Sequence, residues 1–163
     1  MNGIEIIESS LLTAERLALM YLDDLSDEDL MHRPGPNCNT VNWQLGHLIL
    51  SDQRMLAGWL GDRLPHLPTG FAQRYDKQNA AADDPRQFDT KEQLLQVYHQ
   101  QRQALLQQLK RISEEDLQTE SDAAIRGYAP TVGVALSMLP IHWMMHVGQW
   151  IVLRRQLGRE VLI

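Results

Sequence analysis

Apolar residues recur at intervals of three and four from the start of the chain. The first such line is Ile4, Ile7, Leu11, Ala14, Ala18, Tyr21 and Leu25. An α-helix turns about 100° per residue, so these positions share one face, while Glu15 and Arg16 lie off it. The pattern predicts an amphipathic helix over residues 4–25.

The same spacing predicts two more amphipathic helices, over residues 41–60 and 91–112. Their apolar lines are Val41, Leu45, Leu48, Met55, Leu56 and Trp59 in the first, and Leu94, Tyr98, Leu105, Leu109 and Ile112 in the second. Thr40 and Thr90 directly precede these helices, and threonine is a favoured N-cap residue because its hydroxyl accepts from a free backbone N–H. Asp52 shares the apolar line of residues 41–60, an unusual place for a carboxylate.

Residues 61–89 break this periodicity. The stretch contains three prolines, two glycines and no sustained apolar line, although residues 71–82 could form a helical turn or two. A connection of this length is uncommon in a compact domain and is often functional. Phe71, Tyr75 and His66 are therefore candidate substrate contacts, and the alternative is that they are solvent-exposed loop residues.

Residues 131–155, TVGVALSMLPIHWMMHVGQWIVLRR, predict a long helix that is apolar on almost every side. No Asp, Glu, Lys or Arg occurs from residue 131 to residue 153, a length that would cross a bilayer. The stretch also contains two histidines, a glutamine, a serine and a proline, so we interpret it as the central helix of a soluble bundle. Pro140 frees the carbonyl of Leu136 and predicts a kink.

Four helices of similar length, without any strand signal, predict an all-α fold. We expect a four-helix bundle with a long connection between helices 2 and 3, so the helix order need not be simple up-down-up-down. A chain of 163 residues is long enough to bury a core, and we expect residues 1–163 to form one domain.

Composition narrows the possible partners. The net charge of −6 argues against nucleic acid or an anionic membrane as the main partner. A single cysteine, Cys38, excludes an intramolecular disulfide and fits a reducing compartment. Glu5 and Glu8 stand where a secretory signal would be basic and apolar, so we expect a cytoplasmic protein.

Two histidines lie one turn apart in the last predicted helix. They share the stripe Ala135, Leu139, His142, His146, Gln149 and Leu153. Burying unpaired polar groups is costly, and histidines at positions i and i+4 can reach one metal ion. The alternative is that His142 and His146 are core histidines bonded to neighbours. Trp143 replaces the glutamate of the HExxH motif, so no peptidase assignment follows.

A catalytic zinc site needs a third protein ligand and an open position. The candidates for the third ligand are His32, His47, His66, His99, Asp52 and Cys38. His47 is the best placed, because it lies on a predicted helix beside Gly46, which would allow a close approach. It also lies off the apolar stripe, so any site would occupy a cleft beside the core. Periodicity alone leaves this choice open.

Three segments together resemble a known family. NWQLGHL at residues 42–48, HWMMHVGQW at 142–150 and RRQLG at 154–158 are similar to the DinB-like (DinB/YfiT) superfamily, as is the preceding turn LSDEDLMHRPGPNCNTVNW. The resemblance extends over nearly the whole chain. It implies a four-helix bundle, often a homodimer, that holds a divalent metal, zinc or nickel, with His47, His142 and His146.

The resemblance also implies a reaction. Some relatives are S-transferases or isomerases that use bacillithiol, mycothiol or glutathione, so we expect a metal-dependent transferase that uses a low-molecular-weight thiol on small electrophilic substrates. A metal with an open position lowers the pKa of a bound thiol. Gln149 would support a ligating imidazole or only satisfy a buried neighbour. Asp52 would orient a histidine or pair with an arginine.

Two other functions stay open. One is a hydrolase or isomerase with metal-bound water as nucleophile, which would not depend on thiol. The other is a non-catalytic metal-binding stress-response protein, which a fully coordinated metal would favour. Arg126, Arg154 and Arg155 are candidate contacts for the carboxylates of a small thiol, with a helix-dipole role near a helix end as the alternative.

Overall fold

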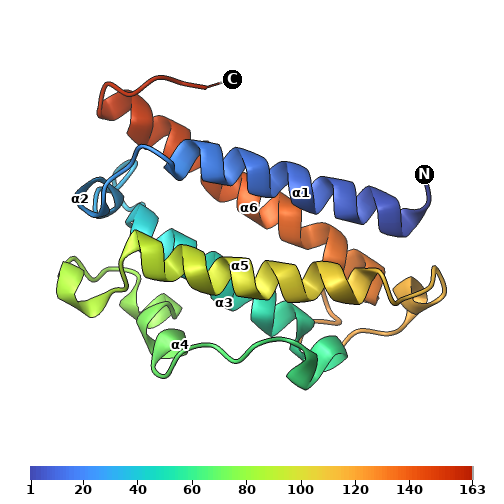
Figure 1. The fold of residues 1–163 in the computed structure, drawn as a ribbon. Helices are drawn as coiled ribbons and strands as arrows, with labels where there is room; N and C mark the ends of the chain where they lie inside the picture. The colour runs from blue at the N-terminus through green and yellow to red at the C-terminus, as the bar shows by residue number, and fades with distance from the viewer. Residues whose placement is uncertain (163) are drawn as a thin grey trace.

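The computed structural model describes residues 1–162, which fold into an all-α structure (Figure 1). The four long helices are α1 (Gly3–Leu22), α3 (Val41–Leu60), α5 (Lys91–Leu109) and α6 (Val132–Gln156). The two short helices are α2 (Asp27–Leu30) and α4 (Phe71–Arg74). Four 3₁₀ turns lie in the connections: η1 (Gly61–Arg63), η2 (Lys77–Asn79), η3 (Pro85–Gln87) and η4 (Asp116–Gln118). The predicted all-α fold is confirmed.

The helix starts follow local capping chemistry. The hydroxyl of Thr40 accepts from the backbone N–H of Trp43, and that of Thr90 accepts from the backbone N–H of Gln93. The Gln93 side chain accepts from the backbone N–H of Thr90 in return, which completes a capping box. Such caps satisfy N–H groups that the first helical turn leaves free. They explain why both starts could be predicted from the sequence.

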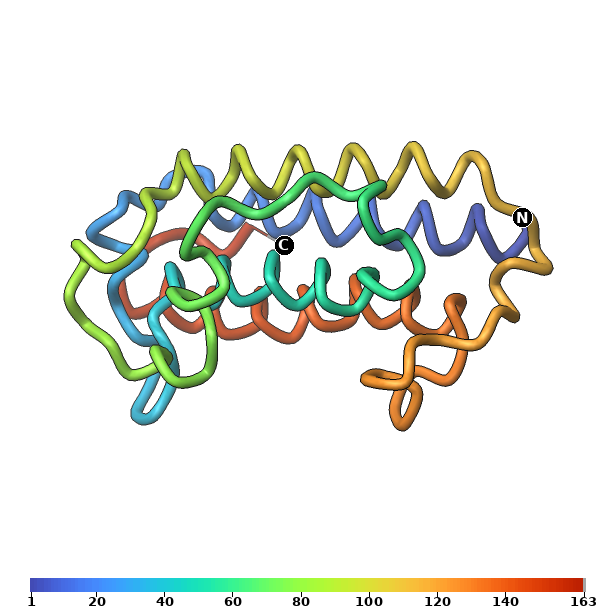
Figure 2. Tube along the Cα trace, turned by 90° about the horizontal axis from the view of Figure 1, so that it is seen from below, coloured from blue at the N-terminus to red at the C-terminus, as the bar shows by residue number. Residues whose placement is uncertain are grey.

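Each long helix packs against two others, in the cyclic order α1, α6, α3 and α5. In Figure 1 the chain runs in one direction along α1 and α6 and in the opposite direction along α3 and α5. The parallel pair α3 and α5 needs a connection that returns along the bundle, and residues 61–90 provide it (Figure 2). The helix order is therefore not up-down-up-down, as the long connection predicted.

The returning connection is packed against α3. An added Cβ on Gly46 would lie 2.1 Å from Cδ1 of Tyr75, so only glycine allows this ring to rest on the helix backbone. The Tyr75 hydroxyl donates to the Asp89 carboxylate at 3.1 Å, and Arg74 pairs with the same carboxylate at 2.9 Å. Phe71 and Tyr75 are 1 % and 0 % exposed, so they are not solvent-exposed loop residues, and their side chains belong to the core.

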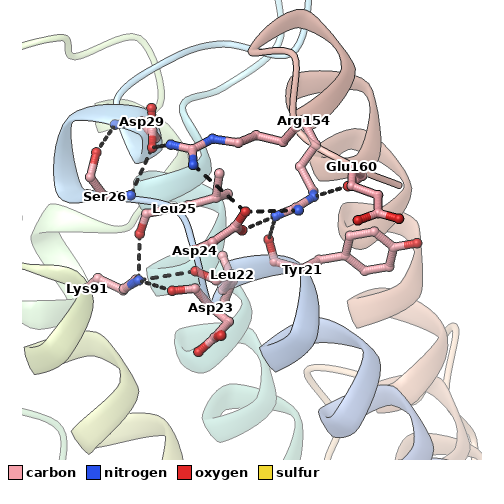
Figure 3. Close-up of polar contacts among 11 residues, drawn as sticks. Tyr21, Leu22, Asp23, Asp24, Leu25, Ser26, Asp29, Lys91, Arg154 and Glu160 are labelled. Atoms are coloured by element: carbon pink, nitrogen blue, oxygen red, sulfur yellow. Dashed lines mark hydrogen bonds and ion pairs between the residues drawn. The ribbon is translucent and has the colours of Figure 1, made fainter. Parts of the chain in front are cut away.

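One end of the bundle is held by cations that bind free backbone carbonyls (Figure 3). The ammonium of Lys91 donates to the carbonyls of Leu22 and Asp23 at 3.1 and 3.0 Å, and to that of Leu25. Lys91 is the first residue of α5, so this contact joins the start of α5 to the end of α1. The last carbonyls of a helix lack partners within it, and a cation there also suits the helix dipole.

Arg154 lies on the other side of the same turn (Figure 3). Its guanidinium pairs with Asp24 and donates to the carbonyls of Tyr21 and Glu160 at 3.1 and 2.9 Å. The side chain is only 1 % exposed. Arg154 therefore joins α6 to α1, and its predicted role as a substrate contact is wrong.

The apolar character of α6 does not make it a membrane span. Within residues 1–162, none of the helices has the combination of length and hydropathy that crossing a bilayer requires. The buried side chains of α6 instead belong to two apolar clusters along the bundle, which also contain residues of α1, α3 and α5.

Candidate metal centre

The buried face of α6 lies beside the histidines. Its inward side chains include Leu136, Leu139, Trp143, Val147 and Trp150, all at most 1 % exposed. His142 and His146 each precede one of these residues, and one helical step of about 100° turns them to the flank, where they are half-buried. The stripe predicted for these histidines therefore lies at the edge of the inward face and not at its centre. The indole rings of Trp143 and Trp150 have the larger apolar area and occupy the centre of the inward face.

Three histidines meet on this flank. His47 comes from α3, while His142 and His146 come from α6, and one ring nitrogen of each lies within 4.8 Å of the others. The centroid of the His47 ring is 5.5 Å from that of His142 and 5.9 Å from that of His146. Among residues 1–162 no other group of His, Cys, Asp and Glu meets this criterion. The triad is the set that the family resemblance implied.

The remaining candidates for a third ligand lie apart from the triad. Nδ1 of His32 contacts the carbonyl of Glu28, and His99 lies 3.8 Å from Glu15 on the other side of the bundle. His66 is exposed and Cys38 is half-buried in the loop before α3. None of these four belongs to the triad.

His47 is held by its own helix. Its ring stacks on the indole of Trp43, with 4.6 Å between centroids and 10° between planes. The Trp43 N–H donates to the carbonyl of Asp76 at 3.2 Å, and the Ser51 hydroxyl lies 3.3 Å from Nε2 of His47. The returning connection thus positions the indole that supports the imidazole.

Gln44 determines which nitrogen of His146 carries the proton. Trp150 can only donate, and its N–H lies 2.9 Å from Oε1 of Gln44. Nδ1 of His146 lies 2.9 Å from the same oxygen, so Nδ1 carries the proton and Nε2 keeps its lone pair. The Gln44 amide donates to the carbonyl of Asn39 at 2.8 Å and to Oε1 of Gln149 at 3.2 Å. A histidine with this orientation is prepared to be a metal ligand.

Sequence reasoning left two roles open for Gln149, support of an imidazole or of a buried neighbour, and did not assign a supporting role to Gln44. Gln149 reaches His146 only through Gln44, so it satisfies a buried amide rather than an imidazole. The sequence contained only a weak indication of the role of Gln44, namely that it lies one turn before His47 on the same flank of α3. Its partners on α6 could be recognised only once the two helices were placed side by side.

Asp52 follows the second alternative considered for it. The buried carboxylate accepts from the Trp143 N–H at 2.8 Å and lies 3.5 Å from the Arg102 guanidinium. Burial raises the pKa of Asp52 to about 6, against the opposing effects of Arg102 and the Trp143 hydrogen bond. Asp52 therefore joins α3 to α5 and α6 and does not contact a histidine of the triad.

The three imidazoles have the charge state that metal binding requires. Burial, followed by the proximity of His142, lowers the pKa of both His47 and His146 to about 4. Burial also lowers the pKa of His142. All three are neutral near pH 7, which is the form that ligates a metal. The residues present therefore fit a divalent ion.

A cleft of about 370 Å³ opens beside His47 and His142. The side chains that complete its wall are Ser51, Arg54, Met55, Lys77, Tyr128, Met138, Ile141 and Met145. This volume lies in the range of small-molecule sites, roughly 300–1,000 Å³. His66, Arg126, Arg154 and Arg155 are not part of the wall. The cleft gives small molecules access to the triad.

A helical bundle with three neutral histidines, two of which line an open cleft, defines the class as a candidate metal-binding four-helix protein. The sequence profile of the DinB superfamily matches residues 10–150, which include all three histidines, and the chain belongs to this superfamily. The crystal structure described as the conserved protein of locus from Enterococcus faecalis has the same fold, with a TM-score of 0.67, 19 % identity and coverage of 98 % of this chain and 99 % of that one. No curated protein matches the sequence.

Proposed function

We propose that this chain is a metal-dependent transferase that uses a low-molecular-weight thiol on small electrophilic substrates, with zinc or nickel held by His47, His142 and His146. The observation that carries the proposal is the meeting of three neutral imidazoles, two of which line an open cleft. A bound divalent ion would act as a Lewis acid that lowers the pKa of a thiol.

The cleft favours thiol chemistry over hydrolysis. Among its described lining residues there is no Asp or Glu that could take a proton from water. A thiol that has lost its proton needs no such base. Thioether and aliphatic side chains, those of Met138, Ile141 and Met145, form the wall beside His142 and suit an apolar electrophile.

A thiol-dependence assay separates the three functions considered. The metal-loaded protein would be incubated with 1-chloro-2,4-dinitrobenzene and each of glutathione, bacillithiol and mycothiol, beside the His142→Ala variant. The proposal predicts saturable turnover with at least one thiol, lost in the variant. Turnover of an ester probe without any thiol would indicate a hydrolase. No turnover of either probe class would indicate metal binding without catalysis.

We also propose a homodimer in the cytoplasm. A groove of about 760 Å³ runs between α1 and α6, and the apolar side chains of Ile6, Ile7, Ala14 and Leu17 line its α1 side, where Ile6 is 51 % exposed. Contiguous exposed apolar surface is a common mark of an interface. Light scattering should give twice the chain mass, and Ile6→Glu should give the monomer mass. A monomeric wild-type protein would contradict the proposal.

A further inference from the structure

The cleft beside the histidine triad has two chemically different walls. Arg54 of α3 and Lys77 of η2 form a basic wall. A second, apolar wall is formed by Met55, Tyr128, Met138, Ile141 and Met145. His47 and His142 line the same cleft. A ligand that contacts the triad can therefore also contact both cationic and apolar side chains.

The basic wall contrasts with the rest of the molecule. The chain has a net charge of −6, yet the described residues that line the cleft include two cations and no carboxylate. Asp76 pairs with Arg54 at 3.1 Å and offsets part of its charge. The ammonium of Lys77 makes no ion pair or hydrogen bond with residues 1–162. Arg54 and Lys77 also lower the pKa of His47, so their positive charges act on the triad.

The apolar wall is exposed without a covering residue. Tyr128, Ile141 and Met145 are 55 %, 59 % and 66 % exposed. The removal of such hydrophobic surface from water by a bound ligand is favourable. Methionine adapts its shape to different ligands because its side chain is unbranched and flexible. This wall suits the hydrocarbon or aromatic body of a small ligand.

We infer that the cleft binds a small amphipathic organic acid, whose acidic group pairs with Lys77 and whose apolar body lies on Tyr128, Ile141 and Met145. The inference rests on the proposed function in one respect, because it takes the ligand of the cleft to be the substrate of the metal centre. The inference specifies in addition that this substrate carries an acidic group and an apolar body. A neutral ligand would leave the ammonium of Lys77 without a partner beside the metal site.

The test compares an acid with its neutral counterpart. Binding of 4-phenylbutyrate and of 4-phenylbutan-1-ol would be measured by isothermal titration calorimetry on the protein as purified and after removal of metal with a chelator. The acid is expected to bind about threefold to tenfold more tightly than the alcohol, as one partly exposed ion pair allows. This preference should survive metal removal, because it depends on Lys77.

Two variants and a matched control test whether Lys77 causes the preference for the acid and whether Tyr128 contacts both ligands. Lys77→Gln should remove the preference for the acid and leave the affinity for the alcohol unchanged. Lys110→Gln, an exposed lysine that does not line the cleft, should keep the preference. Tyr128→Ala should weaken both ligands by a similar factor. Equal binding of acid and alcohol by the wild-type protein, or a preference that persists in Lys77→Gln or disappears with the metal, would overturn the inference.

These outcomes are distinct from failure of the proposed reaction. A charge preference that depends on Lys77, found in a protein without thiol-dependent turnover, would remove the transferase and keep the organic-acid site. Thiol-dependent turnover in a protein that binds acid and alcohol equally would keep the transferase and remove the organic-acid site.

Discussion

Trp150 and His146 donate to the same oxygen, Oε1 of Gln44, each at 2.9 Å. The indole cannot accept, so it fixes the orientation of the amide, and the amide fixes the proton of the imidazole on Nδ1. Eight residues further along α3, Asp52 accepts from Trp143 at 2.8 Å. Two indoles of α6 thus hold α3 on either side of the triad, and they set the spacing of the three histidines.

Replacing Gln44 should weaken metal binding without removing a ligand. Gln44→Leu takes away the acceptor that orients His146, and we expect a roughly 10- to 100-fold loss of zinc affinity. The free indole N–H of Trp150 should also lower the free energy of unfolding by about 1–3 kcal/mol. Competition with a chromophoric chelator measures the affinity. Gln149→Leu, which leaves the contact to His146 in place, is the control and should have a smaller effect.

Asp52 should make the stability of the protein pH-dependent. Its pKa in the folded protein, about 6, exceeds the reference value of 3.8, so the folded state binds the proton more tightly than the unfolded state. The resulting stabilisation is complete below about pH 4 and is lost as the pH rises through about 6, with an upper bound of about 3 kcal/mol.

Urea unfolding at several pH values between 4 and 7 tests this dependence. The free energy of unfolding of the wild-type protein should fall relative to that of Asp52→Asn as the pH rises across this interval. The variant carries no titrating group at this position, so the difference isolates Asp52. A difference that stays constant from pH 4 to pH 7 would contradict the assignment.

Gly46→Ala should disturb the returning connection. The new Cβ would lie 2.1 Å from the Tyr75 ring, so the ring must move and its contact with Asp89 must weaken. We expect a loss of about 1–3 kcal/mol in the free energy of unfolding, as for other overpacked sites. Gly148→Ala is the matched control, because no atom lies within 4 Å of its added Cβ in the middle of α6. That change should be neutral or stabilising.

Arg154 should matter for stability and not for the metal site. Arg154→Met leaves the buried carbonyl of Tyr21 without its partner and removes the ion pair to the partly exposed Asp24, and we expect a loss of about 1–3 kcal/mol. Arg155→Met, at the exposed neighbouring position, should change the free energy of unfolding by less than about 0.5 kcal/mol. Metal content should be unchanged in both variants. Loss of metal in Arg154→Met would place this residue in the site.

The features that depend on local sequence could be predicted. The starts of α3 and α5 follow from Thr40 and Thr90, whose side chains reach backbone N–H groups only three residues away. The helical face of residues 4–25 follows from spacing, because polar residues mark its outer side. The long connection between α3 and α5 could be predicted because residues 61–89 contain no sustained line of apolar residues.

The inward face of α6 could not be predicted in this way, because a helix that is apolar on all sides carries no contrast between its faces. Which residues face inward was decided by the partners on α3, where Gln44 and Asp52 accept from the two indoles. The same limit applies to His47. Its spacing left the third ligand open, and the family resemblance indicated it before the fold placed it beside His142 and His146.

The central claim is that His47, His142 and His146 hold a divalent metal. The most direct test is elemental analysis of untagged protein, purified without a metal column, beside His47→Ala, His142→Ala and the control His32→Ala at an exposed position outside the triad. We expect close to one zinc or nickel per chain in the wild-type protein and the control, and loss of that metal in the two triad variants, with the helical fold kept. Full metal occupancy in either triad variant, or no metal in the wild-type protein even after addition of zinc or nickel, would contradict the claim.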